Sequence, residues 1–143
     1  MLNLTRHRAP QPQPKLPNGT DLIKIITEHG FDERVAALGG LFGAGVYFAE
    51  MCSKSDQYCT PNESGIFNMF LSRVVFGSSH PTTVGMPRNS NGDATRRPPD
   101  MPGTSGRPHD SIVYRPGGNK YNEFIVYDKA QAYPEFLVEF KRE

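Results

Sequence analysis

The chain has 143 residues, enough for one domain with a modest core and too few for a second catalytic module. Its 16 lysines and arginines nearly balance 15 aspartates and glutamates, and the net charge of +1 is far from the basic excess that marks a general nucleic-acid binder. The longest apolar stretches fall well short of the roughly 20 residues that cross a bilayer. We therefore expect no membrane insertion and no direct nucleic-acid binding.

The first 17 residues differ in composition from the rest of the chain. Four prolines, which have no amide donor, stand among Gln, Lys and Arg, and the segment has little apolar surface to bury. We expect residues 1–17 to be a disordered lead and residues 18–143 to form the domain.

The domain begins with a helical pattern. Asn18 or Thr20 can cap a helix, and an apolar stripe follows over the next two turns. Gly30 is placed to end the helix, because glycine adopts the left-handed conformation of a C-terminal cap at low cost. The pattern predicts a helix near 21–29.

A glycine-rich loop separates this helix from the next elements. Residues 46–48 combine β-branched and aromatic side chains, which is typical of a short buried strand. Ser53, with Asp56 three positions later, resembles a capping box. We predict a second short helix from this box through Tyr58.

The second half of the chain is predicted to be mostly β. The run 67–76 is rich in strand formers and bounded by glycines, which indicates a strand in the interior of a sheet. Residues 77–110 lack periodicity and are predicted to be a surface insertion. Three further strands are expected at 112–114, 124–127 and 136–140.

The segment 40–58 holds the densest cluster of unusual residues. Its glycines allow close approach of a ligand to the backbone, and Tyr47 and Tyr58 offer flat ring faces that could hold a planar heterocycle. The alternative is a glycine-rich turn whose tyrosines pack the core. Neither a Rossmann fingerprint nor a P-loop is present, so any nucleotide must be held in another way.

A carboxylate near the C-terminus is a second candidate. Glu123 stands at the start of a predicted strand among aromatic residues, where it could be partly desolvated and directed into a cleft. An ordinary edge carboxylate would show the same pattern. The four histidines and two cysteines lack the spacing of a metal site, so we expect no metal.

Two long blocks resemble a known family. The first block, residues 30–58, reads GFDERVAALGGLFGAGVYFAEMCSKSDQY. It closely resembles the nicotinamide-pocket block of the poly(ADP-ribose) polymerase catalytic domain, and its sequence is most similar to that of the tankyrases. NEFIVYDKAQAYPEFLVEF (122–140) resembles the closing strands around that family's catalytic glutamate. The resemblance implies an α+β ADP-ribosyltransferase fold with mixed, mainly antiparallel β-sheets and short flanking helices. The prolines of the lead would interrupt strand pairing, so the first part of that fold is expected to be missing or degenerate.

The resemblance also implies roles for individual residues in transfer of ADP-ribose from NAD. Tyr47 and Tyr58 would flank nicotinamide, while Ser55 and Gly19 would hydrogen-bond its carboxamide. Glu123 would be the catalytic carboxylate that stabilises charge on the ribose and polarises the acceptor. The resemblance also places Lys54 near the same pocket. A solvated position on the helix, without a role in the pocket, is an equally good interpretation of Lys54.

The chain also differs from the family at the start of the first helix and in the segment 60–68. A His-Gly-Ser/Thr triplet begins the family's helix, and Asn18-Gly19-Thr20 stands in that register, so Asn18 replaces the histidine that holds an NAD ribose. Loss of one good hydrogen bond to a ligand costs about 0.5–1.5 kcal/mol. The tankyrase zinc ligands are also absent from 60–68.

The leading hypothesis is an intracellular, nuclear or cytoplasmic ADP-ribosyltransferase that uses NAD as substrate and releases nicotinamide. Its expected acceptors are proteins or a growing ADP-ribose chain. The alternative is a weakened or inactive module that binds NAD-like ligands or a partner without turnover, and the substitution at Asn18 favours it.

Overall fold

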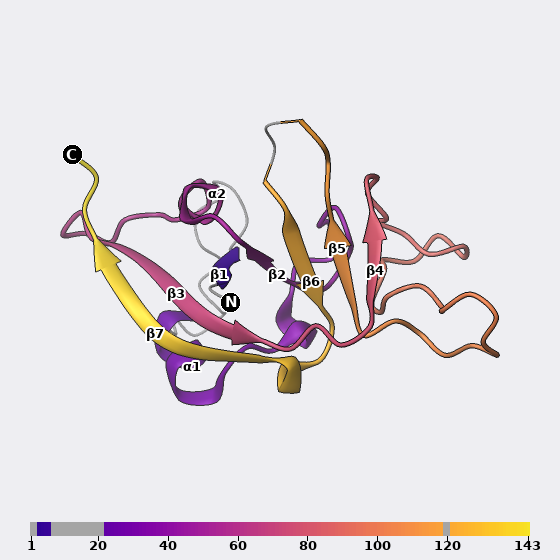
Figure 1. Ribbon diagram of the computed structural model, residues 1–143. Coiled ribbons are helices and arrows are strands. Elements are labelled where there is room, and N and C mark those ends of the chain that lie inside the picture. The colour runs from indigo at the N-terminus through magenta and orange to yellow at the C-terminus, as the bar shows by residue number, and fades with distance from the viewer. Residues whose placement is uncertain (1–2, 7–21, 119–120) are drawn as a thin grey trace.

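The computed structural model describes residues 3–6, 22–118 and 121–143, and its strands are hydrogen-bonded in the order β4-β5-β6-β2-β1-β3-β7 (Figure 1). The pairing of β4 with β5 is parallel and the other pairings are antiparallel. This mixed, mainly antiparallel arrangement with short helices confirms the predicted α+β class. The strands are β1 (Asn3–Arg6), β2 (Val46–Ala49), β3 (Phe67–Val74), β4 (Ser79–Thr82), β5 (Ser111–Tyr114), β6 (Glu123–Val126) and β7 (Ala132–Phe140).

Strand β1 corrects one expectation about the N-terminal lead. Residues 3–6 pair with β2 on one side and β3 on the other, and so connect the two halves of the sheet. This strand is defined by backbone pairing with strands from later in the chain, which no local pattern in the lead predicts. Residues 7–17 lie outside the described residues, and the domain division at residue 18 stays a prediction.

Helix α1 (Leu22–His29) confirms the predicted first helix. It buries Ile26, and it ends where Gly30 takes a φ of +78° and its amide donates to the Ile26 carbonyl at 2.9 Å. The predicted caps, Asn18 and Thr20, lie outside the described residues. The helix lies beside β7 (Figure 1).

Helix α2 (Cys52–Asp56) is shorter than predicted and begins differently. Its N-cap is Met51, which makes no side-chain capping hydrogen bond, so the predicted capping box from Ser53 to Asp56 is wrong. Asp56 instead lies in the last turn, where its carboxylate accepts from Arg142. A short 3₁₀ helix, η1 (Glu33–Val35), follows α1, and a second, η2 (Lys129–Gln131), precedes β7.

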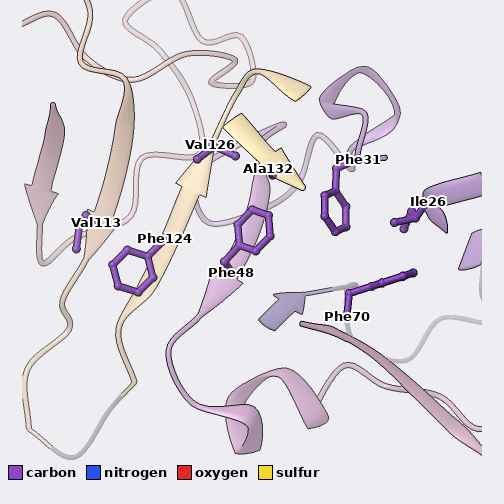
Figure 2. Packing of buried hydrophobic residues seen from close by; sticks show 8 residues of the cluster. All are labelled: Ile26, Phe31, Phe48, Phe70, Val113, Phe124, Val126 and Ala132. Carbon is purple, nitrogen blue, oxygen red and sulfur yellow. The ribbon is translucent and has the colours of Figure 1, made fainter. Parts of the chain in front are cut away.

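The two faces of the sheet carry separate apolar cores. The larger core packs beneath α1, where the Phe31 ring meets the rings of Phe48 and Phe70 edge-on at 5.6 and 5.9 Å. Burying one such aromatic side chain contributes about 1.5–3 kcal/mol. Figure 2 shows this cluster, which consists of Ile26, Phe31, Phe48, Phe70, Val113, Phe124, Val126 and Ala132. The smaller core contains Phe42, Tyr47, Ile112 and Ile125.

The strands β3 and β7 form a long curved pair away from β4 and β5 (Figure 1). The prediction that β3 lies inside the sheet is confirmed, since it pairs with β1 and β7 and buries residues on both faces. Strand β7 begins earlier than predicted and is one of the two edge strands of the sheet, with β4 at the other edge. Tyr133 and Phe136 on β7 are 66% and 59% exposed, so its apolar alternation does not reflect burial.

The segment 77–110 is more than the surface insertion that we predicted. Residues 79–82 form β4, and the rest projects from the sheet edge as two lobes, closed by the isolated bridges Arg88–Ala94 and Asp100–Pro108 (Figure 1). Thr95 of the first lobe is buried, and its carbonyl accepts from the Ala44 amide at 2.8 Å. The insertion therefore packs on the glycine-rich loop before β2.

None of the helices in the described ranges has the length and apolar character that a bilayer span requires.

Candidate active site

Glu123 is the first residue of β6 and lies inside the sheet rather than at its edge. Its cross-strand partners are Ala49 of β2 and Tyr114 of β5. The residue is only 5% exposed. Burial of a carboxylate is unfavourable unless charged or hydrogen-bonding groups compensate it, so its neighbours are the first place to look for function.

Lys54 of α2 supplies a positive charge beside this carboxylate. Its Nζ lies 3.5 Å from Oε1 of Glu123, with side-chain exposures of 18% and 6% for the pair. The same ammonium donates to the Tyr58 hydroxyl at 3.3 Å and lies 5.3 Å from the centre of the Tyr58 ring. One lysine therefore joins the candidate carboxylate to a candidate aromatic residue.

Ser55 and Tyr58 occupy the end of α2 and the turn that follows. Ser55 is 1% exposed, and its carbonyl accepts from the Tyr58 amide at 3.0 Å. The Ser55 carbonyl also receives the Cys59 thiol at 3.6 Å, and this thiol lies 3.3 Å from the Asn68 carbonyl of β3. Burial raises the pKa of the Cys59 thiol, which keeps it protonated as a donor. These contacts fix the turn that carries Tyr58.

Tyr47 lies on the same face of the sheet as Glu123. In β2 and β6, Tyr47 stands opposite Ile125 and Ala49 stands opposite Glu123. Cross-strand partners project on the same face, and so do residues two positions apart along a strand. The alternation therefore directs Tyr47 and Glu123 to one face, and Phe48 and Phe124 to the opposite core.

The Tyr47 hydroxyl is committed to the glycine-rich loop. It accepts from the Phe42 amide at 2.8 Å and donates to the Gly43 carbonyl at 3.0 Å. Tyr127 holds the same turn from β6's end, because its hydroxyl donates to the Phe42 carbonyl at 2.7 Å. Burial, with Tyr47 nearby, raises the pKa of Tyr127, so this hydroxyl stays protonated. Gly43 has a φ of +68°, a conformation that favours glycine.

The structure thus brings together part of the predicted site. Lys54 of α2 contacts both Tyr58 and Glu123, and the neighbouring Ser55 is buried. Tyr47 is buried on the same sheet face as Glu123, with its hydroxyl turned to the loop. Asn18, Gly19 and Thr20 lie outside the described residues.

Lys54 is the residue that the sequence alone left undecided. A lysine four positions before an aromatic residue on a helix is a signal for their contact, since residues at that spacing are neighbours on a helix surface. That signal finds Tyr58, but it cannot reveal a carboxylate 69 positions along the chain.

Among the predicted site residues that the structure describes, none lines the hollow of about 350 Å³ formed by Pro81, Thr82, Thr83 and Arg115. Within the described ranges, no three His, Cys, Asp or Glu side chains come close enough to hold a metal ion. The candidate site therefore rests on the side-chain contacts around Lys54 and Glu123.

Comparison with known proteins matches residues 19–142 to the family model of the poly(ADP-ribose) polymerase catalytic domain. Human protein mono-ADP-ribosyltransferase PARP11 is 29% identical over 142 aligned residues, which cover 85% of this chain and 38% of that protein. Poly [ADP-ribose] polymerase 1 of Arabidopsis thaliana is 32% identical over 123 residues, which cover 73% of this chain and 12% of that protein. Poly [ADP-ribose] polymerase of Sarcophaga peregrina is 31% identical over 123 residues, covering 70% of this chain and 12% of that protein.

The chain spans well under half the length of these relatives. Their names include both a mono-ADP-ribosyltransferase and poly(ADP-ribose) polymerases. The closeness to tankyrases and the truncation of the fold stay predictions.

Proposed function

Because the chain belongs to the poly(ADP-ribose) polymerase catalytic-domain family, we propose that it transfers ADP-ribose from NAD to an acceptor and releases nicotinamide. The proposed acceptors are a protein side chain or a growing ADP-ribose chain. The observation that carries the proposal is the buried carboxylate of Glu123 with Lys54 and Tyr58 beside it.

The proposal gives α2 and the following turn the task of orienting the leaving group. Tyr58 supplies a ring face and Ser55, three positions earlier on α2, supplies a hydroxyl, a pair of groups that suits a planar pyridine carboxamide. Gly19 and Tyr47 are proposed to complete this slot, with Asn18 and Thr20 nearest the NAD ribose. Fixing the leaving group in one orientation lowers the entropic part of the barrier.

Glu123 is proposed to act on the sugar. Departure of nicotinamide breaks the bond between the anomeric carbon and the pyridine nitrogen, and the electron pair of that bond stays on the nitrogen. Positive charge then develops on the anomeric carbon and the ring oxygen, and a carboxylate in a water-poor site stabilises it. As the acceptor oxygen bonds to the anomeric carbon, Glu123 accepts the hydrogen bond of the acceptor hydroxyl and assists loss of its proton.

Lys54 is proposed to keep this arrangement electrically balanced. A buried carboxylate without a partner is costly, and an ammonium at 3.5 Å compensates its charge. The same ammonium contacts Tyr58, so the sugar-facing and ring-facing parts of the site are fixed relative to each other.

The test is substitution of Glu123 by Gln in the full chain, with labelled NAD as substrate. Loss of the carboxylate charge should reduce automodification and nicotinamide release by about 10²-fold or more, the scale of a lost catalytic group. Glu139→Gln on the exposed strand β7 is the matched control and should retain activity. Unchanged labelling in Glu123→Gln, with an unchanged melting temperature, rejects the assignment.

The retained glutamate also favours elongation of ADP-ribose chains over single transfers, as the family resemblance implies. Products of the wild-type chain should therefore form a ladder on a denaturing gel. A single shifted band at saturating NAD would assign single-unit transfer instead.

A binding module without turnover is the second candidate, and the observation that favours it is Asn18 at the position of the family's histidine. A shorter side chain there reaches the ribose differently. Asn18→His should raise labelling if the site is otherwise competent. Stabilisation of the chain by benzamide, with no labelling in either form, supports the binding module.

A further inference from the structure

Arg142, close to the end of the chain, binds the end of helix α2. Its Nη2 donates to the Asp56 carbonyl at 2.7 Å and to Asp56 Oδ1 at 3.0 Å, and its Nε donates to the same Oδ1 at 3.2 Å. A single guanidinium thus binds both the backbone and the side chain of one helical residue.

The guanidinium also stacks on an aromatic pair. Its central carbon lies 4.3 Å from the centre of the Phe67 ring, and the Phe67 and Phe140 rings stack at 5.4 Å. Phe67 begins β3 and Phe140 ends β7, and the two residues are cross-strand partners. The end of the β3–β7 pair therefore provides a platform that fixes the direction of Arg142.

Helix α2 needs such support because it has little of its own. A helix of five residues is too short to be stable alone, and its start lacks a side-chain cap. Ser55 is its one buried residue among those described. On the inner side, Lys54 contacts Glu123, and on the outer side, Arg142 holds Asp56.

We propose that Arg142 is a positioning residue that holds α2, and with it Lys54, Ser55 and Tyr58, in register with Glu123. The inference rests on the proposed function, in which these residues bind the nicotinamide part of NAD. Arg142 touches no reacting group in this scheme. It acts through the helix, and the contact couples the C-terminal end of β7 to the ligand slot.

The strength of the contact comes from its geometry rather than from charge alone. Side-chain exposures of 47% and 34% for Arg142 and Asp56 mean that solvent screens much of the attraction. Three directed donor contacts and a ring face restrict the guanidinium in a way that a lysine cannot reproduce, because the arginine fork is planar and rigid.

The experiment uses the full chain, with Arg142→Ala, Arg142→Lys and Arg73→Ala. Arg73 is the matched control, because it is an exposed arginine of β3 whose ion pair is with Glu135 of β7 rather than with a residue of α2. The readouts are the dissociation constant of benzamide, the kcat and KM for NAD, and hydrogen exchange of amides 52–59.

Arg142→Ala should weaken benzamide binding by about threefold to tenfold, the effect of losing one or two hydrogen bonds. The KM for NAD should rise by a similar factor and kcat should fall as well, since α2 both binds nicotinamide and orients it as the leaving group. Arg142→Lys should recover part of the loss. Arg73→Ala should match wild type in benzamide binding and in KM.

Three results would overturn the assignment. The first is unchanged benzamide affinity in a folded Arg142→Ala that retains wild-type exchange at 52–59. The second is an equal loss in Arg73→Ala, and the third is an unchanged KM for NAD in Arg142→Ala.

Failure of the proposed function would look different. If wild type neither binds benzamide nor turns over NAD, then the proposed function is rejected. Hydrogen exchange then tests separately whether Arg142 holds α2. Faster exchange at 52–59 in Arg142→Ala alone would retain Arg142 as the residue that holds α2, whereas unchanged exchange would reject that role too.

Discussion

Removal of the Tyr47 hydroxyl should reveal how much this one group contributes to the stability of the loop before β2. Tyr47→Phe keeps the ring in the smaller core but takes the acceptor from the Phe42 amide and the donor from the Gly43 carbonyl. Phe42 and Gly43 are both buried, so water cannot easily replace either partner.

The magnitude follows from the number of groups left without a partner. One buried polar group that loses its partner costs about 1–3 kcal/mol, and two such groups in one turn give about 2–4 kcal/mol after partial relaxation. For a domain of this size, this corresponds to a fall in melting temperature of roughly 7–14 °C. Tyr127→Phe removes a single donor from the Phe42 carbonyl, so it should cost about half as much.

The assay compares urea unfolding of wild type, Tyr47→Phe and Tyr127→Phe, with benzamide binding measured well below the melting temperatures. Because the ring remains, Tyr47→Phe should retain most of its benzamide affinity in spite of its lower stability. If Tyr47→Phe is as stable as Tyr127→Phe or more so, then the two hydrogen bonds do not hold the loop and the reasoning fails.

Three further predictions concern other parts of the molecule. Gly43→Ala should be much less stable than Gly65→Ala in thermal unfolding: both glycines have positive φ, but a Cβ at Gly43 would overlap the Thr95 carbonyl and one at Gly65 meets open space. Lys54→Met should lower the free energy of unfolding by about 3 kcal/mol, because the buried carboxylate loses the ammonium that compensates its charge. Addition of Glu123→Gln should restore more than half of this loss in urea unfolding, and no recovery in the double variant would contradict the coupling. Hydrogen bonds from Arg34 lower the pKa of the Asp32 carboxyl from 3.8 to about 2, so their stabilisation is present above pH 4 and is lost as the pH falls towards 2. Asp32→Asn should therefore be less stable than wild type at pH 6, and urea unfolding should show the difference closing between pH 4 and 2; a constant difference over that range would contradict it.

Local patterns in the sequence determined much of the fold. The apolar stripe and the terminal glycine located α1, and clusters of β-branched and aromatic residues located β2, β5 and β6, because these signals arise within a few neighbouring residues. The block resemblance also indicated the family, which the comparison with its catalytic domain then established. The candidate residues around α2 came from the same resemblance, and the roles assigned to them stay proposals.

Only the tertiary structure decided which distant residues meet. Strand β1 forms by pairing between β2 and β3, although its own residues give no strand signal. Asp56 suggested a local cap but binds Arg142, which lies 86 positions away, and Lys54 pairs with Glu123 across the fold. Such contacts depend on the order of the strands and on the packing of α2. They join residues that are far apart in the sequence, so no short segment of the sequence can predict them.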